Sequence, residues 1–209
     1  MSARISAINL EDLALYMESR PEVARTAARI AINDVTVRTA LPTFRKGIEA
    51  EVAFPAGYVD KDRLGQTQKA TDANLTAIIT ARFRPTSLAR FAQGQSFEGA
   101  RRTGGVNVRV KRGGGAKRLK GGFFVRLNRG GDTQDGFNVG LAIRLKPGEA
   151  LRGRKKGGSS VQLAPNLYLL YGPSVDQIFR DVSVTESPKV ADKLTQEFTR
   201  QWVRLNTSI

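Results

Sequence analysis

The residue types in this chain that could do chemistry are mostly cationic. Its 209 residues include 34 Lys and Arg against 19 Asp and Glu, no Cys and no His, for a formal net charge of +15. The lack of Cys and His excludes disulfides, thiol catalysis and Cys/His zinc sites. It also removes the usual general base at neutral pH. The sequence therefore predicts a protein that is not an enzyme and that carries no cofactor.

Other groups of residues that could do chemistry are better explained by structural roles. Two acidic pairs could ligate a divalent cation, but exposed acids on a helix or loop are much commoner: Glu49 with Glu51, and Asp60 with Asp62. The segment GGGAKRLKGG has its glycines and Lys in the wrong order for a phosphate-binding loop. Tyr168 and Tyr171 precede Ser174, and we interpret them as strand and turn packing. No catalytic or metal site is predicted.

The basic residues are concentrated in one part of the chain. Residues 101–156 contain 16 Lys and Arg against three acidic residues, so +13 of the net charge lies there, together with 13 of the 21 glycines. Such clusters favour phosphate backbones without reading base sequence. Docking to an acidic protein surface is an equal alternative to nucleic-acid contact. The simplest explanation is that these residues form two solvated loops that bind no ligand. The residues predicted to contact DNA or a partner are Lys111, Arg112, Lys117, Arg118, Lys120, Arg152, Arg154, Lys155 and Lys156.

Helices are predicted near both ends of the chain. A short helical stripe covers residues 8–17, and a longer Ala-rich helix follows over residues 22–41, with Ser19 as N-cap and Pro21 in its first turn. Pro42 is expected to kink or end that helix, and residues 44–52 are expected to continue it on the far side if it kinks. A short helix is expected around residues 59–64. The last helix is predicted to begin at Ser187-Pro188, with apolar residues every three or four positions: Val190, Leu194, Phe198, Trp202 and Leu205.

Strands are predicted between these helices. Residues 75–83 alternate apolar and polar side chains, with Phe83 on the apolar face. Residues 106–110 and 123–127 are predicted to form two strands that present the basic stretch between them as a charged tip. Further strands are expected over residues 137–146 and 167–171, separated by a loop at 147–160 and followed by a helix that opens at Ser174. The prediction is a single α+β domain over residues 1–209 with a mostly antiparallel sheet.

Three segments form a recognisable set: GGFFVRLNRG (121–130), NVGLAIRLK (138–146) and NLYLLYGPSVDQIF (166–179). They resemble the C-terminal half of the minor tail protein Z family of long-tailed bacteriophages, where a G-x-F strand, a charged strand pair and a closing LYGPS turn recur. The most specific part is 169–179, through Tyr171, Gly172, Pro173, Ser174 and Phe179. The Ala-rich helix and the NLTAIITARF strand extend the resemblance over about residues 20–205. Basic Gly-rich insertions at about 101–122 and 147–160 exceed the family pattern.

This resemblance implies a structural virion protein that completes the tail at its head-proximal end. The implied partners are the tail terminator, tail tube and head–tail connector proteins, with the genome end in the channel. A homo-oligomeric ring is expected, a hexamer being favoured, assembled in the host cytoplasm. No run approaches the roughly 20 apolar residues that a spanning helix needs, so no membrane association is expected. The alternative is a cellular nucleic-acid-binding protein that uses basic Gly-rich hairpin loops.

Overall fold

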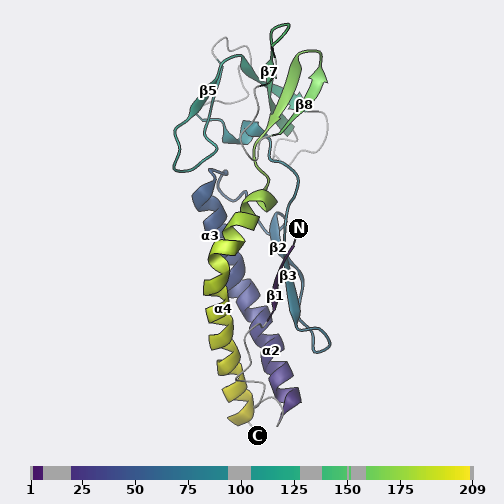
Figure 1. Ribbon diagram of the computed structural model, residues 1–209, viewed down its shortest axis with the longest axis vertical. Helices are drawn as coiled ribbons and strands as arrows, with labels where there is room; N and C mark the ends of the chain where they lie inside the picture. The colour runs from purple at the N-terminus through teal and green to yellow at the C-terminus, as the bar shows by residue number, and fades with distance from the viewer. Residues whose placement is uncertain are drawn as a thin grey trace. The chain divides into compact units, whose positions relative to one another are not determined.

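The computed structural model describes residues 2–6, 20–93, 105–127, 138–149, 151 and 159–207. Helices and antiparallel strands occur together, as Figure 1 shows, and the predicted α+β class is confirmed. The chain divides into two compact units: Met1–Ile48 with Val59–Arg82 and Phe179–Ile209, and Glu49–Tyr58 with Phe83–Ile178. The single-domain organisation stays a prediction. The predicted helical stripe at 8–17 lies outside the described residues.

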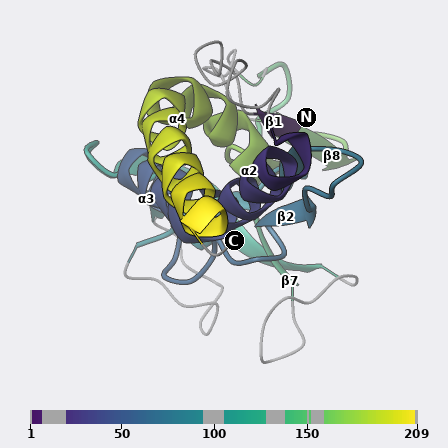
Figure 2. The same cartoon turned by 90° about the horizontal axis from the view of Figure 1, so that it is seen from below.

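The first unit contains most of the helical structure. Helix α2 (Pro21–Val35) continues through a π-helical segment, η1 (Thr36–Ala40), into α3 (Leu41–Glu51), and α4 (Val175–Thr207) lies beside them (Figures 1 and 2). The buried side chains of α2 are small, which permits close packing of neighbouring elements: Ala24, Ala27, Ala28 and Ala31. Pro21 begins α2 as expected, but the N-cap is Arg20 and not Ser19, and no side chain caps this end.

The helix passes Pro42 because of the π-helical segment. A proline at position 42 cannot donate a backbone hydrogen bond, and its ring would clash with the carbonyl of Arg38 in a regular α-helix. In η1 the N–H of Leu41 bonds to the carbonyl of Thr36, five residues earlier, so the turn is wider. The wider turn gives the Pro42 ring room. The helix therefore does not end at Pro42, and the expected continuation on its far side is confirmed as far as Glu51.

A second proline is also accommodated inside a helix. The sequence predicted a new helix at Ser187-Pro188, whereas α4 runs without a break from Val175 to Thr207. Pro188 and Val184, whose carbonyl loses its helical partner, both lie on the exposed side, where water can satisfy that carbonyl. The predicted stripe is confirmed for Val190, Leu194 and Phe198, which are buried, while Trp202 and Leu205 are half-buried.

The sheet of the first unit has the order β1-β3-β2, with β1 at Ser2–Ser6, β2 at Leu64–Gln68 and β3 at Thr76–Ala81. The predicted alternation is confirmed in β3 by buried Ala77, Ile79 and Ala81, but Phe83 lies beyond the strand and is 67% exposed. The short helix predicted at 59–64 is wrong. The carboxylate of Asp60 there accepts the backbone N–H groups of Asp62 and Arg63 in a turn that leads into β2.

The second unit is built on antiparallel strands. A four-stranded sheet has the order β6-β7-β9-β8, with β6 at Gly122–Leu127, β7 at Asn138–Arg144, β8 at Ser159–Ala164 and β9 at Leu167–Tyr171. A separate two-stranded ribbon pairs β4 (Val106–Val108) with β5 (Lys117–Leu119), and a 3-10 turn covers Leu88–Phe91. β8 was not predicted: its first two residues, Ser159 and Ser160, fall in the segment expected to be a loop, and no element was expected over residues 161–164. It pairs with β9 across a tight turn in which Asn166 has a φ of 59°.

A glycine shows how tightly one face of this sheet is filled. A Cβ at Gly140 of β7 would lie 2.4 Å from a methyl carbon of Leu169 and 3.1 Å from one of Val125. Leu169 comes from β9 and Val125 from β6, so the neighbours on both sides cover the glycine. Leu141, Ala142 and Leu170 are buried as well. The strands of this sheet are therefore held by packing and not only by their hydrogen bonds.

A candidate polyanion-binding ribbon

The basic ribbon, residues 105–120, is the hairpin of β4 and β5. Its register pairs Val106 with Leu119, Asn107 with Arg118 and Val108 with Lys117. The sequence instead predicted that residues 123–127 would be the partner of the first strand. Those residues form β6 in the four-stranded sheet, because the chain turns after β5 at Gly121, whose φ is +75°. A charged hairpin is present as predicted, but the segment between its strands is shorter than expected, because Lys117, Arg118 and Leu119 form the second strand.

The backbone of the ribbon is held on both sides by other segments of the same unit. On one side, residues 91–93 exchange hydrogen bonds with it: Arg109 N to Phe91 O at 2.9 Å and Gln93 N to Asn107 O at 3.0 Å. On the other, residues 51–53 do the same: Ala53 N to Val110 O at 2.8 Å and Arg112 N to Glu51 O at 3.0 Å. The backbone around residues 107–112 therefore has fixed partners, and binding a ligand would cost little ordering entropy there.

Buried apolar side chains anchor the ribbon from beneath. Val106 and Val108 are 4% and 6% exposed. In the same unit Phe54 stacks on Tyr58 with ring centroids 5.2 Å apart and lies 5.4 Å from Phe91. Because the valines alternate with Asn107, one face of β4 points to the core and the other to solvent. The ribbon is thus a folded element of the unit.

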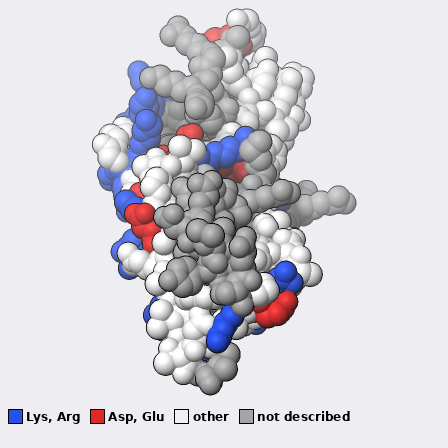
Figure 3. Space-filling model, turned by 60° about the horizontal axis from the view of Figure 1, so that its bottom comes forward, with Lys and Arg blue, Asp and Glu red and all other residues white. Residues whose placement is uncertain are grey.

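The cations of the ribbon are exposed. All five predicted contact residues that the structure describes, Lys111, Arg112, Lys117, Arg118 and Lys120, have exposed side chains. Within the described ranges, Lys111, Lys117 and Lys120 form no ion pair. In Figure 3, blue Lys and Arg side chains follow one another along the upper left edge, the side on which Figure 1 shows β5. The positive charge of these three lysines remains available to a ligand.

Two arginines of the ribbon differ in role. Arg112 donates its Nε–H to the backbone carbonyl of Glu49, so this side chain also ties the ribbon to the end of α3. Arg109, which the sequence did not single out, donates from Nη2 to the carbonyl of Arg112 and is half-buried. Its alternation with the valines gave no sign of this contact. Arg152, Arg154, Lys155 and Lys156 lie outside the described residues.

The segment that resembles the phage family forms a strand end, a turn and a helix cap. Tyr171 ends β9, and Gly172 donates its N–H to the carbonyl of Thr86 at 2.8 Å. A Cβ at Gly172 would lie 2.7 Å from the ring of Phe91, so this position is filled by its neighbour. Buried Pro173 follows and leads into α4. The turn has packing reasons for its residue types that are independent of any ligand.

Ser174 caps α4 through a reciprocal pair of hydrogen bonds. The N–H of Gln177 bonds to Ser174 Oγ at 3.1 Å, and the Gln177 side chain accepts the Ser174 N–H at 2.9 Å. This is a capping box, and buried Asp176 in the first turn adds a favourable charge at the helix N-terminus. In the first unit, Phe179 packs edge-on against Phe44 with centroids 5.3 Å apart. The hydroxyl of Ser174 is therefore occupied structurally.

Of the acidic residues considered as cation ligands, Asp60 has structural partners for its carboxylate, and Glu49 and Glu51 have them for their backbone carbonyls. Asp60 forms an ion pair with Arg63 in addition to its turn, and Glu49 and Glu51 hold the ribbon through their carbonyls. Across the described ranges, no group of three or more acidic side chains is placed to hold a metal ion.

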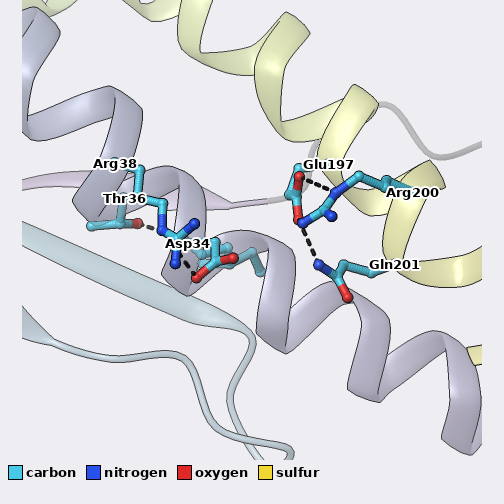
Figure 4. A network of polar contacts seen from close by, with 7 residues as sticks. Asp34, Thr36, Arg38, Glu197, Arg200 and Gln201 are labelled. Atoms are coloured by element: carbon cyan, nitrogen blue, oxygen red, sulfur yellow. Dashed lines mark hydrogen bonds and ion pairs between the residues drawn. The ribbon is translucent and has the colours of Figure 1, made fainter. Parts of the chain in front are cut away.

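A second polar cluster lies between the helices of the first unit (Figure 4). Glu197 of α4 accepts hydrogen bonds from Arg200 at 2.6 Å and from Gln201 at 2.6 Å, and Asp34 lies 3.9 Å from Arg38. The hydrogen bond from Arg200 holds the pKa of the Glu197 carboxyl below its ordinary value. The hydrogen bond from Gln201 and the charge of Arg38 also lower this pKa, whereas partial burial raises it. Glu197 in turn raises the pKa of Arg200. The printed contacts lie within α4 and within the α2–η1 segment, and only the charge of Arg38 acts across to Glu197.

Comparison with known proteins finds no matching family model, no similar curated protein and no similar solved structure. Among the described helices, none is long and apolar enough to cross a membrane.

Proposed function

We propose that this protein is a structural component of a tailed-phage virion that completes the tail at its head-proximal end. The observation that carries the proposal is the basic ribbon, a preformed element with exposed and unpaired lysines in a chain of net charge +15. The resemblance of residues 169–179 to the tail-completion family supplies the setting. A neck channel contains the genome end, and a basic element facing it would meet phosphates.

Repetition would amplify the effect of a modest site. In a ring, each subunit contributes one ribbon at the same height around the channel. Each Lys–phosphate contact releases condensed counterions, so affinity depends on salt in proportion to the number of contacts. The three unpaired lysines correspond to a change of about 2.7 in the slope of log K against log salt for one subunit, at about 0.9 per contact. A ring multiplies this contribution.

The test is assembly of particles without the protein, followed by complementation. Without it, tails are expected to remain unjoined to filled heads in negative-stain images. Wild-type protein restores joining, whereas a Lys111→Gln/Lys117→Gln/Lys120→Gln variant restores it poorly. The matched control is Lys46→Gln/Lys61→Gln/Lys69→Gln, which removes the same charge from exposed positions of the first unit. Normal numbers of joined particles in the absence of the protein would refute the proposal.

A cellular nucleic-acid-binding protein is the second candidate. It is favoured by one observation: the ribbon is anchored within a single chain, so it is formed before any ring assembles. This function predicts salt-sensitive binding of duplex or RNA by the isolated monomer. The tail-completion proposal predicts that binding is weak until subunits assemble. Fluorescence anisotropy with a labelled duplex, at protein concentrations where light scattering shows a monomer, separates the two.

A further inference from the structure

Strand β8 forms one edge of the four-stranded sheet and is exposed over most of its length. β9 is its partner, and no other described strand pairs with it (Figure 1). Ser160 to Ala164 are all exposed, and Val161 and Leu163 keep 51% and 46% of their surface in water. An edge strand presents a row of backbone N–H and C=O groups that can pair with another strand. Here that row is flanked by apolar side chains.

The edge lacks most of the features that normally prevent pairing. Edge strands are usually protected by Lys, other charges or Pro. β8 reads SSVQLA, and the whole stretch Ser159–Tyr171 contains no charged residue. A bulge between Gln162 and Ala164 interrupts the ladder at its far end, so the regular part covers Ser159–Gln162. In a chain of net charge +15, a charge-free edge is a surface on which two copies can meet with little repulsion.

The other edge of the same sheet has the matching strand. β6 pairs with β7 and ends the strand order on that side, and it is six residues long, as β8 is. The sheet is antiparallel throughout, so β6 and β8 run in opposite directions. Placed beside β8, the β6 of a second copy would therefore continue the antiparallel pattern. Its half-exposed Val125 lies on the same face of the sheet as Val161, so these two apolar side chains would meet.

We propose that copies of this chain join head to tail, with β8 of one subunit pairing to β6 of the next. The alternative, β8 against β8 about a two-fold axis, leaves both β6 edges open. The head-to-tail arrangement pairs both edges of each four-stranded sheet, and closing it into a ring leaves neither of those edges exposed. The inference rests on the proposed function for its expectation of a ring, and it names the surface that builds the ring.

Cysteine cross-linking tests this directly, because the chain has no native cysteine. Ser160 of β8 and Arg126 of β6 are both exposed, and the strand register places them on the same face of the sheet. Within one chain β7 and β9 separate them, a distance of about 14 Å at 4.8 Å per strand, too far for a disulfide. Mixing full-length Ser160→Cys with Arg126→Cys and oxidising should give a covalent dimer. The double variant should give a ladder of multimers.

The outcomes are separable. A dimer from Ser160→Cys alone, as abundant as in the mixture, would show two-fold pairing of β8 and overturn the proposal. No product in the mixture at high protein concentration would overturn it too. Val161→Lys, at an exposed position, should abolish the ladder, and the matched Val184→Lys on α4, where Val184 is 77% exposed, should not. If the double variant gives a ladder but heads join tails normally without the protein, the interface is supported and the tail-completion role is refuted. If joining fails without the protein but no ladder forms, the tail-completion role is supported and the interface is refuted.

Discussion

Gly47 of α3 tests the packing of α3 against α4. A Cβ added there would lie 2.5 Å from Cγ1 of Val182, about 1 Å inside the roughly 3.5 Å at which carbon atoms make contact. Val182 is 3% exposed, and a β-branched side chain in a helix has one strongly preferred rotamer, so it cannot swing aside. In an open helix Gly→Ala would stabilise by about 1 kcal/mol. Overpacking of this kind costs about 1–3 kcal/mol, so Gly47→Ala should be neutral to destabilising by about 2 kcal/mol.

A double-mutant cycle isolates this clash. Val182→Ala alone removes two buried carbons and should cost about 1.6 kcal/mol or more, at about 0.8 kcal/mol per carbon. In the double variant the new methyl of residue 47 occupies part of the vacated space and the helix-propensity gain is realised. We expect the double variant to be more stable than the sum of the single effects by at least about 1 kcal/mol. Urea unfolding measures all four proteins. Additivity within about 0.5 kcal/mol, or a Gly47→Ala variant stabilised by a full 1 kcal/mol, would refute the reasoning.

Three further predictions concern α4. Ser174→Ala removes the capping box and should lower the free energy of unfolding by about 1 kcal/mol, with Ser174→Thr retaining most of it; equal melting temperatures for the two would contradict this. Pro188→Ala restores a helical hydrogen bond and should stabilise by up to about 3 kcal/mol in chemical denaturation, and a loss of stability would show that the proline has a packing role. Because the folded-state pKa of Glu197 is lowered, its stabilisation is present above the unfolded-state pKa of about 4.3 and is lost as pH falls. Wild type should therefore lose more stability than Glu197→Gln between about pH 5 and 3, and parallel curves would contradict the assignment.

The elements that the sequence predicted well are those whose pattern records burial. The alternation of β3 and the stripe of α4 each reflect a single buried surface, which periodicity reports directly. The apolar run of β9 reflects burial on both faces, where Leu169 and Leu170 lie. The charge of the basic region is also a local property, and its exposure follows from the cost of burying unpaired cations. The cap at Ser174 belongs to the same class, because its partner Gln177 is three residues away.

The predictions that failed depended on partners far away in the chain. Pro188 was predicted to lie at the start of a helix because local rules penalise proline inside one, yet α4 runs through it, with buried Val182 and Val190 on either side. β8 carries little apolar signal, and it is a strand because β9 pairs with it. Residues 59–64 were predicted to be a short helix, but the Asp60 carboxylate accepts backbone N–H groups there and organises a turn.

The sequence alone determined the class of this protein: a folded α+β chain without Cys or His chemistry, with its positive charge confined to one Gly-rich region. The tertiary structure decided which strands pair and what the charged tip is. It placed Lys111 beside Val52 and joined β4 to β5, and it left β6 to another sheet. Strand pairing depends on contacts between residues distant in sequence, and many registers satisfy the same local pattern. Only the packed structure selects one, and with it the ribbon and the open edge on which both proposals rest.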